Sequence, residues 1–235
     1  MVGVVVTKEP DGLVAPPTVV AEMFGESVER LNRFVALLAE QGVERGLIGP
    51  REIERIWDRH VLNSAVVGEL VPEGAHVVDV GSGGGFPGVP LALARPDISI
   101  TLLESMARRV QWLEEVLDEL SLENADVLRG RAEEKAVRAE LGAVDVVTAR
   151  AVAPLGRLAQ WCLPLLRTGG LLLAVKGASV AEEIARDEAI VEKAGGESID
   201  VVQCGVDVLE VPATVVVIEA APRSVRSRKG RRRRR

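Results

Sequence analysis

Short runs of aliphatic and β-branched residues alternate with amphipathic segments from residue 76 onward. The runs predict strands at residues 76–80, 99–103, 125–128, 144–148, 171–175, 199–203 and 214–219. The segments between them carry helical spacing, most clearly at 108–120, where Val110, Leu113 and Leu117 share one face. Strands that alternate with helices in this way predict a parallel sheet with helices on both faces.

The end of the chain breaks this alternation. Residues 178–194 predict a helix, but only a loop with Gly205 and Pro212 separates the last two predicted strands. Two neighbouring strands without a crossover helix pair antiparallel. The pattern therefore predicts an α/β fold with a mostly parallel, seven-stranded, Rossmann-like sheet whose last strand is antiparallel.

The N-terminal part has a different pattern, with helical spacing and no strand-like run. Residues 18–39 predict one helix, and Pro50 opens a second that ends near Gly68. These helices are too short and too open to be stable alone. We divide the chain into a flexible lead-in (1–17), an N-terminal helical region (18–72), a sheet domain (73–222) and a basic tail (223–235).

Charge is distributed unevenly along the 235 residues. The net charge is −6, but the first 222 residues hold 20 basic and 35 acidic groups, and nine basic residues follow Pro222 without an acid. With almost no apolar residue, this segment predicts a disordered tail. Clustered arginines suit a polyanion such as nucleic acid, although a solvated tail without a partner remains an alternative.

Several classes of protein are excluded by simple counts. No apolar run reaches the ~20 residues of a membrane helix, and Val2–Val6 lacks the basic flank of a secretory signal. Cys162 and Cys204 form no metal or disulfide framework, and two histidines do not make a zinc site. We expect no metal and a reducing, cytoplasmic location.

The strongest local motif follows the first predicted strand. The segment Val77-Val78-Asp79-Val80 leads into Gly81-Ser82-Gly83-Gly84-Gly85-Phe86-Pro87-Gly88, and a helix follows. Glycines allow a tight turn and a close approach of backbone to ligand, and a helix start offers free N–H groups. The segment predicts a nucleotide or nucleoside site at the carboxyl end of a parallel strand.

Two ligand classes fit this loop, and a third does not. The loop lacks the Gly-Lys-Ser/Thr of a P-loop, whereas Gly83, Gly85 and Gly88 do fit G-x-G-x-x-G, which keeps a dinucleotide possible. Asp79 stands beside the loop, where a carboxylate would repel a pyrophosphate. It would suit an ammonium or sulfonium group, and S-adenosylmethionine carries both.

Acidic and basic residues follow the next strands. Glu104 ends the second strand, where a carboxylate accepts from a ribose diol in either ligand class, and Glu133 follows the third, where it could accept from an adenine amine. Both could instead be first-turn acids of helices. Arg150 ends the fourth strand and Lys176 the fifth. Each could contact substrate or cofactor, or form an ion pair, for Arg150 with Asp79 or Glu104.

These motifs in this order resemble the RsmG family, also called glucose-inhibited division protein B. The resemblance spans about residues 25–220 and rests on Val78–Gly88, Leu103–Ser105, Gly130–Glu133, Ala149–Ala151 and Lys176–Gly177. It implies a class I methyltransferase that moves a methyl group from S-adenosylmethionine to guanine N7 in the 530 loop of 16S rRNA, releasing S-adenosylhomocysteine. It also implies that loss of activity gives low-level streptomycin resistance.

The resemblance implies cofactor contacts at Gly81, Phe86, Ala132, Glu133 and Arg150. With the residues singled out above, the predicted cofactor-binding set is Asp79, Gly81, Ser82, Gly83, Gly85, Phe86, Glu104, Ala132, Glu133 and Arg150. The predicted RNA-binding set is Arg131, Lys176, Arg223, Arg226, Arg228 and Lys229. We expect a monomer whose partner is the small ribosomal subunit.

Guanine N7 carries a free lone pair at neutral pH, so the reaction needs no general base. We therefore name no certain catalytic residue, and Arg150 is a candidate for orienting substrate or cofactor. His60 is either a packed, helix-tying histidine or part of the site. Phe86 is the best aromatic candidate for stacking on a base, or else a hydrophobic cap on the loop.

Two other functions remain open. One is a class I methyltransferase that acts on a different RNA, a small molecule or a protein, and methyl transfer without ribosomal RNA would favour it. The other is an NAD-binding oxidoreductase or a binding module without catalysis. Asp79 and the missing catalytic Lys, Tyr or His weigh against the second, and binding of NADH would favour it.

Overall fold

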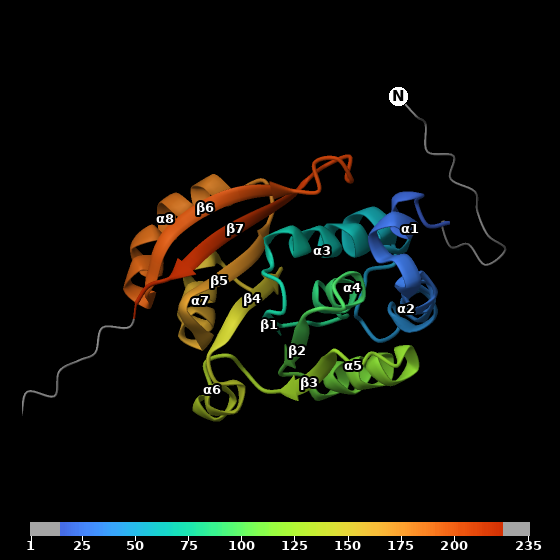
Figure 1. Cartoon of the computed structure of the whole chain (residues 1–235), viewed down its shortest axis with the longest axis horizontal. Helices are drawn as coiled ribbons and strands as arrows, with labels where there is room; N and C mark the ends of the chain where they lie inside the picture. The colour runs from blue at the N-terminus through green and yellow to red at the C-terminus, as the bar shows by residue number, and fades with distance from the viewer. Residues whose placement is uncertain (1–14, 223–235) are drawn as a thin grey trace, which may run out of the picture.

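The computed structural model of the chain describes residues 15–222. The basic tail and most of the lead-in predicted from the sequence lie outside these residues. One twisted sheet runs through the described part, with helices packed against both of its faces (Figure 1).

The sheet has seven strands in the order β3-β2-β1-β4-β5-β7-β6. Neighbours from β3 to β5 are parallel, and β7 is antiparallel to both β5 and β6. The predicted sheet with its antiparallel closing strand is confirmed. The strands are β1 (His76–Val80), β2 (Ser99–Glu104), β3 (Ala125–Arg129), β4 (Val144–Arg150), β5 (Leu166–Lys176), β6 (Gly196–Cys204) and β7 (Ala213–Ala220).

The central strands form because their side chains are buried on both faces. In β1, Val77, Val78 and Val80 are buried together with Asp79, which explains why apolar and polar residues do not alternate along this strand. Val80 pairs in register with Leu103 of β2 and with Ala149 of β4. The carboxyl ends of these parallel strands therefore meet at one edge of the sheet.

The helices form two layers. Residues from α1, α2, α4 and α5 share a buried cluster on one face, and residues from α6, α7 and α8 share a cluster on the other. The helices are α1 (Val19–Phe24), α2 (Val28–Gln41), α3 (Asn63–Ala65), α4 (Gly88–Ala94), α5 (Ala107–Leu120), α6 (Lys135–Leu141), α7 (Leu155–Cys162) and α8 (Val180–Ala194), with short 3-10 helices η1 (Gly25–Ser27), η2 (Ile53–Arg55), η4 (Val66–Leu70) and η5 (Leu163–Leu165) and a π-helix η3 (Ile56–Leu62).

Three predicted elements differ from the observed ones. The single helix predicted over residues 18–39 is wrong, because Gly25 has a φ of 48° and a 3-10 turn separates α1 from α2. The helix predicted from Pro50 begins at Ile53 and changes type along its length, with the wide π-helix η3 at its centre. Strand β5 starts at Leu166, earlier than predicted, and joins β4 through a register shift near Val144.

The N-terminal helices belong to the core of the molecule. Leu31, Phe34 and Ile56 are fully buried, and they share one hydrophobic cluster with Val77 of β1 and Leu102 of β2. The helical region thus obtains the apolar partners that its own length does not supply. None of the helices in the described part of the chain is long and apolar enough to span a membrane.

Candidate cofactor site

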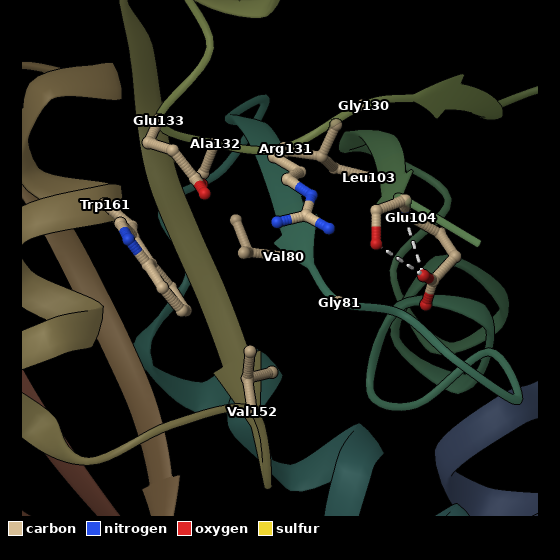
Figure 2. Close-up of a pocket in the computed structure, with 11 residues that line it drawn as sticks. Val80, Gly81, Leu103, Glu104, Gly130, Arg131, Ala132, Glu133, Val152 and Trp161 are labelled. Carbon is tan, nitrogen blue, oxygen red and sulfur yellow. Dashed lines mark hydrogen bonds between the residues drawn. The ribbon is translucent and has the colours of Figure 1, made fainter.

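A cavity of about 190 Å³ opens at the carboxyl edge of the sheet. It lies where β1, β2 and β3 end, and α7 closes its far side (Figure 2). Side chains and backbone from five separate segments line it. The lining residues are Val80, Gly81, Leu103, Glu104, Ser105, Gly130, Arg131, Ala132, Glu133, Val152 and Trp161.

The glycine-rich loop forms one side of this cavity because its backbone can pass close to its neighbours. Gly81 has a φ of 74°, and a Cβ there would lie 2.8 Å from Val152. Its N–H donates to the carbonyl of Leu103 at 2.8 Å, which ties the loop to β2. A larger residue at Gly81 would push apart the two segments that line the cavity.

Asp79 stabilises the glycine-rich loop from inside the protein core and does not line the cavity. Its buried carboxylate accepts from the N–H of Gly88 at 3.0 Å and from the hydroxyl of Thr148 at 3.1 Å. Gly88 begins α4, so the carboxylate fixes the loop to the start of that helix. Burial raises the pKa of Asp79 to about 6, and the hydrogen bonds oppose this rise.

Glu104 has the position predicted for a ribose contact. One oxygen accepts from the N–H groups of Ser105 (2.7 Å) and Met106 (2.9 Å), and the other accepts from the N–H of Gly83 (3.1 Å). The guanidinium of Arg109 lies 3.8 Å from the second oxygen. A carboxylate offers about four acceptor sites, so the second oxygen keeps capacity for a ligand hydroxyl.

The turn after β3 supplies three neighbouring residues to the cavity. Ala132 is buried, whereas Arg131 and Glu133 are exposed to solvent and also line the cavity. The guanidinium of Arg131 reaches into the middle of the cavity in Figure 2. Of the predicted cofactor-binding residues, Gly81, Glu104, Ala132 and Glu133 line this one cavity, together with one residue predicted to bind RNA.

Arg150 points away from the cavity, toward the π-helix η3. It donates to the carbonyl of Arg59 at 2.7 Å, to the hydroxyl of Ser64 at 3.2 Å and to Nδ1 of His60 at 3.2 Å. The ion pair with Asp79 or Glu104 that the sequence left open is not among the ion pairs of residues 15–222. Burial lowers the pKa of Arg150 to about 10, so the side chain stays charged at neutral pH.

Phe86 and His60 complete this contact between loop and helix. The Phe86 ring lies 5.1 Å from the His60 ring and 5.5 Å from the Phe34 ring, and the Arg150 guanidinium lies 5.8 Å from its centre. His60 also bonds Glu52 at 2.9 Å. These contacts are those of a hydrophobic cap and a helix-tying histidine, the two packing alternatives left open by the sequence.

The remaining candidates lie apart from the cavity. Lys176 forms an ion pair with Glu183 at 2.8 Å and donates to the carbonyl of Ala153 at 3.0 Å. Ser82 is buried, and its hydroxyl donates to the carbonyl of Asp79. The predicted tail contacts Arg223, Arg226, Arg228 and Lys229 lie outside the described residues. Across residues 15–222 no group of His, Cys, Asp and Glu is arranged to hold a metal ion.

The sequence did not single out Trp161 and Val152 as part of the site. Val152 lies in the loop directly after β4, and Trp161 lies on α7, the helix that follows this loop. Ligands of parallel sheets lie beyond the carboxyl ends of the strands. The position of this segment after β4 could therefore have predicted that it lines the cavity. The pattern of Leu155, Leu158 and Cys162 marks the buried face of α7 but gives no role to Trp161.

The donors and acceptors of the cavity fit an adenosine ligand. Glu104 offers acceptor capacity on one side, Trp161 and Val152 offer apolar surface on the other, and the cavity edge carries the glycine loop. The strand order and this glycine loop after β1, with an acid at the end of β2, define a class I methyltransferase.

The comparisons with known sequences then give the family. Residues 27–210 match the sequence model of the GidB family, described as rRNA small subunit methyltransferase G, and the chain belongs to this family. A relative from Corynebacterium efficiens named ribosomal RNA small subunit methyltransferase G is 53% identical over 206 residues, which cover 88% of each chain.

Solved structures with low identity support the fold alone. The mitomycin 7-O-methyltransferase MmcR is 18% identical with a TM-score of 0.56, covering 86% of this chain and 67% of its own. Aeropyrum pernix fibrillarin, solved with natively bound S-adenosyl-L-methionine, is 22% identical with a TM-score of 0.50, covering 68% of this chain and 74% of its own.

Proposed function

We propose that this chain transfers a methyl group from S-adenosylmethionine to N7 of one guanine in the 530 loop of 16S rRNA. The observation that carries the proposal is the cavity at the strand ends, in which Glu104 and the Gly81 backbone stand beside the turn at Ala132 and Glu133. Membership in the rRNA small subunit methyltransferase G family supports the substrate class.

The cofactor, when bound, supplies an electrophilic methyl group on a sulfonium centre. Glu104 would hold the ribose hydroxyls, and the Gly81 backbone would let the rest of the ligand approach the loop closely. Glu133 stands where an adenine amine would donate. These residues fix the ligand in one orientation, which is the main requirement for an in-line transfer.

The side chains that could act as a general base or nucleophile are buried or already bonded, which suits a substrate that needs no activation. Cys162 is fully buried, and burial raises the pKa of its thiol to about 12. Burial likewise raises the pKa of Cys204 to about 11. His60 is engaged by Glu52 and Arg150 and is not a free base. Guanine N7 attacks with a lone pair that is free at neutral pH, so alignment suffices.

The RNA would be held by charge beside the cavity. N7 of a paired guanine lies in the deep, narrow major groove of A-form RNA, so the target base must be unpaired or splayed out. Arg131 in the cavity lining and the basic residues Arg223, Arg226, Arg228 and Lys229 remain the proposed phosphate contacts. Lys176 would first have to leave Glu183. We place the enzyme in the cytoplasm as a monomer that meets the small subunit there.

The test is direct methylation of the proposed substrate. Small ribosomal subunits that lack their own modification are incubated with the protein and methyl-labelled S-adenosylmethionine, and the label is mapped. We expect label at N7 of one guanine in the 530 loop. Binding of the cofactor without label in ribosomal RNA would reject the substrate, and label in another RNA or a small molecule would favour the alternative methyltransferase.

A further inference from the structure

Trp161 presents the aromatic surface of the proposed cofactor cavity. Its indole lines the cavity opposite Glu104, and Figure 2 shows it beside Val80 and Val152. The guanidinium of Arg157, one helical turn earlier on α7, lies 5.8 Å from the indole centre. Arg157 is not one of the lining residues, so it packs on the indole from outside the cavity.

The two sides of the cavity differ in chemistry. Glu104 offers carboxylate oxygens on one side, whereas Val80, Val152 and Trp161 offer apolar and aromatic surface on the other. A nucleoside has the same polarity, because its ribose carries hydroxyl donors and its base is a flat aromatic ring. With the ribose held by Glu104, the base must lie toward Trp161.

We infer that the indole of Trp161 is the wall on which the adenine of S-adenosylmethionine stacks. This inference rests on the proposed function, since it assigns one end of the proposed cofactor to one side of the cavity. Nothing in the sequence pattern assigns this role to Trp161.

The distribution of tryptophans makes the inference measurable. The chain has three, and Trp57 and Trp112 are only 5% and 1% exposed. Trp161 is half-buried and lines the cavity. A stacked purine changes the emission of the indole that it touches, so Trp161 should report most of the change on ligand binding. Trp112 does not line the cavity, but its indole N–H donates to the carbonyl of Gly84 at 3.2 Å, so it adds a smaller change if the glycine loop moves.

The first experiment is a fluorescence titration of the full chain with S-adenosylhomocysteine, with calorimetry on the same samples. We expect a saturable change in emission whose midpoint matches the calorimetric Kd. Trp161→Phe should still bind, since phenylalanine also stacks, but should lose most of the emission change. Trp57→Phe is the matched control and should retain it.

The second experiment measures the stacking itself. Trp161→Leu keeps an apolar side chain but removes the aromatic face, and we expect it to weaken S-adenosylhomocysteine about 10-fold, within the range measured for base–aromatic stacking. Adenosine should lose affinity by the same factor, because it keeps the base and lacks the amino-acid part. If Trp161→Leu does not fold, the fluorescence titrations of the wild type and Trp161→Phe still decide whether the ligand stacks on Trp161.

The outcomes separate this inference from the proposed function. Calorimetric binding with unchanged emission, or an emission change that persists undiminished in Trp161→Phe, overturns the role of Trp161 and leaves the cofactor in place. An unchanged affinity in a folded Trp161→Leu variant does the same. Absence of any binding by calorimetry rejects the proposed function and the inference together.

Discussion

The guanidinium of Arg150 donates to Nδ1 of His60 at 3.2 Å and thereby joins the end of β4 to the π-helix η3. Since Nδ1 accepts this bond, the ring proton is on Nε2, which donates to Glu52 at 2.9 Å. Burial lowers the pKa of His60, and the charge of Arg150 lowers it further. The chain therefore holds one neutral tautomer between a cation and a carboxylate.

Arg150→Ala should lower the free energy of unfolding by about 3 kcal/mol, because it leaves the carbonyl of Arg59 and the hydroxyl of Ser64 without their charged donor. Arg150→Lys should recover only part of this, since one ammonium cannot reach the same set of acceptors. Urea unfolding measures both variants. A stable Arg150→Ala protein that loses affinity for S-adenosylhomocysteine would instead support the cofactor contact implied by the family resemblance.

The imidazole nitrogens of His60 should show the proton on Nε2 and a titration below the ordinary pKa of ~6.5. Because the pKa of His60 is lower in the folded state, the unfolded chain binds the proton before the folded chain does as the pH falls. The stability contributed by neutral His60 is therefore complete above pH ~6.5 and is lost as the pH falls through the folded-state pKa. Nitrogen NMR checks this, with His76→Gln to assign the two histidines; a titration above pH 6.5 would contradict it.

Asp79→Asn should change the pH dependence of stability in a defined direction. The pKa of Asp79 is about 6 in the folded chain, against 3.8 for an aspartate free in water, so the folded chain keeps the proton longer. The wild type should lose on the order of 3 kcal/mol relative to the variant as the pH rises from about 4 to about 6, and nothing further above that. Unfolding curves at several pH values measure the difference, and a flat difference would show that the carboxylate is better solvated than the structure indicates.

Glu104→Gln should weaken S-adenosylhomocysteine by roughly 1–3 kcal/mol, because an amide replaces a charged acceptor and its nitrogen opposes either the ligand or the N–H of Gly83. Glu104→Ala should cost more, since it also frees the N–H groups of Ser105 and Met106. Calorimetry measures both, and Glu114→Gln, which changes an exposed acid on α5 outside the cavity, is the control for charge. Equal affinity in a folded Glu104→Gln protein would remove the ribose assignment.

Deleting residues 223–235 removes nine basic residues and should reduce RNA affinity and its dependence on salt. Binding of S-adenosylhomocysteine should not change, because the lining of the cavity comes entirely from residues 80–161. Binding to a 530-loop RNA at several salt concentrations, for the full and the shortened chain, measures the effect. Identical slopes would assign the RNA contacts to the body of the protein.

Periodicity predicted the sheet well because the central strands, β1 and β4 above all, are buried between helix layers and are correspondingly apolar. It also placed Glu104 correctly at the end of β2, since that position depends only on where the strand ends. The break at Gly25 was missed because a glycine in a helical pattern does not by itself show a positive φ.

The directions of the side chains at the site could not be predicted from the sequence. Arg150 ends β4 as predicted, but its hydrogen bonds go to the carbonyl of Arg59 and to Nδ1 of His60 on η3. Asp79 was placed beside the loop, yet it faces the start of α4. Trp161 was overlooked because the role of its indole depends on a cavity formed by three strands distant in sequence.

The shared core of the N-terminal helices and the sheet has a consequence for engineering. A cut near residue 72 would separate Phe34 and His60 from Phe86 in the glycine loop and from Arg150 on β4. The N-terminal helices are therefore not an interchangeable module. A chimaera that takes them from a relative must bring compatible partners for Phe86 and Arg150, or the loop that borders the proposed cofactor cavity loses its support.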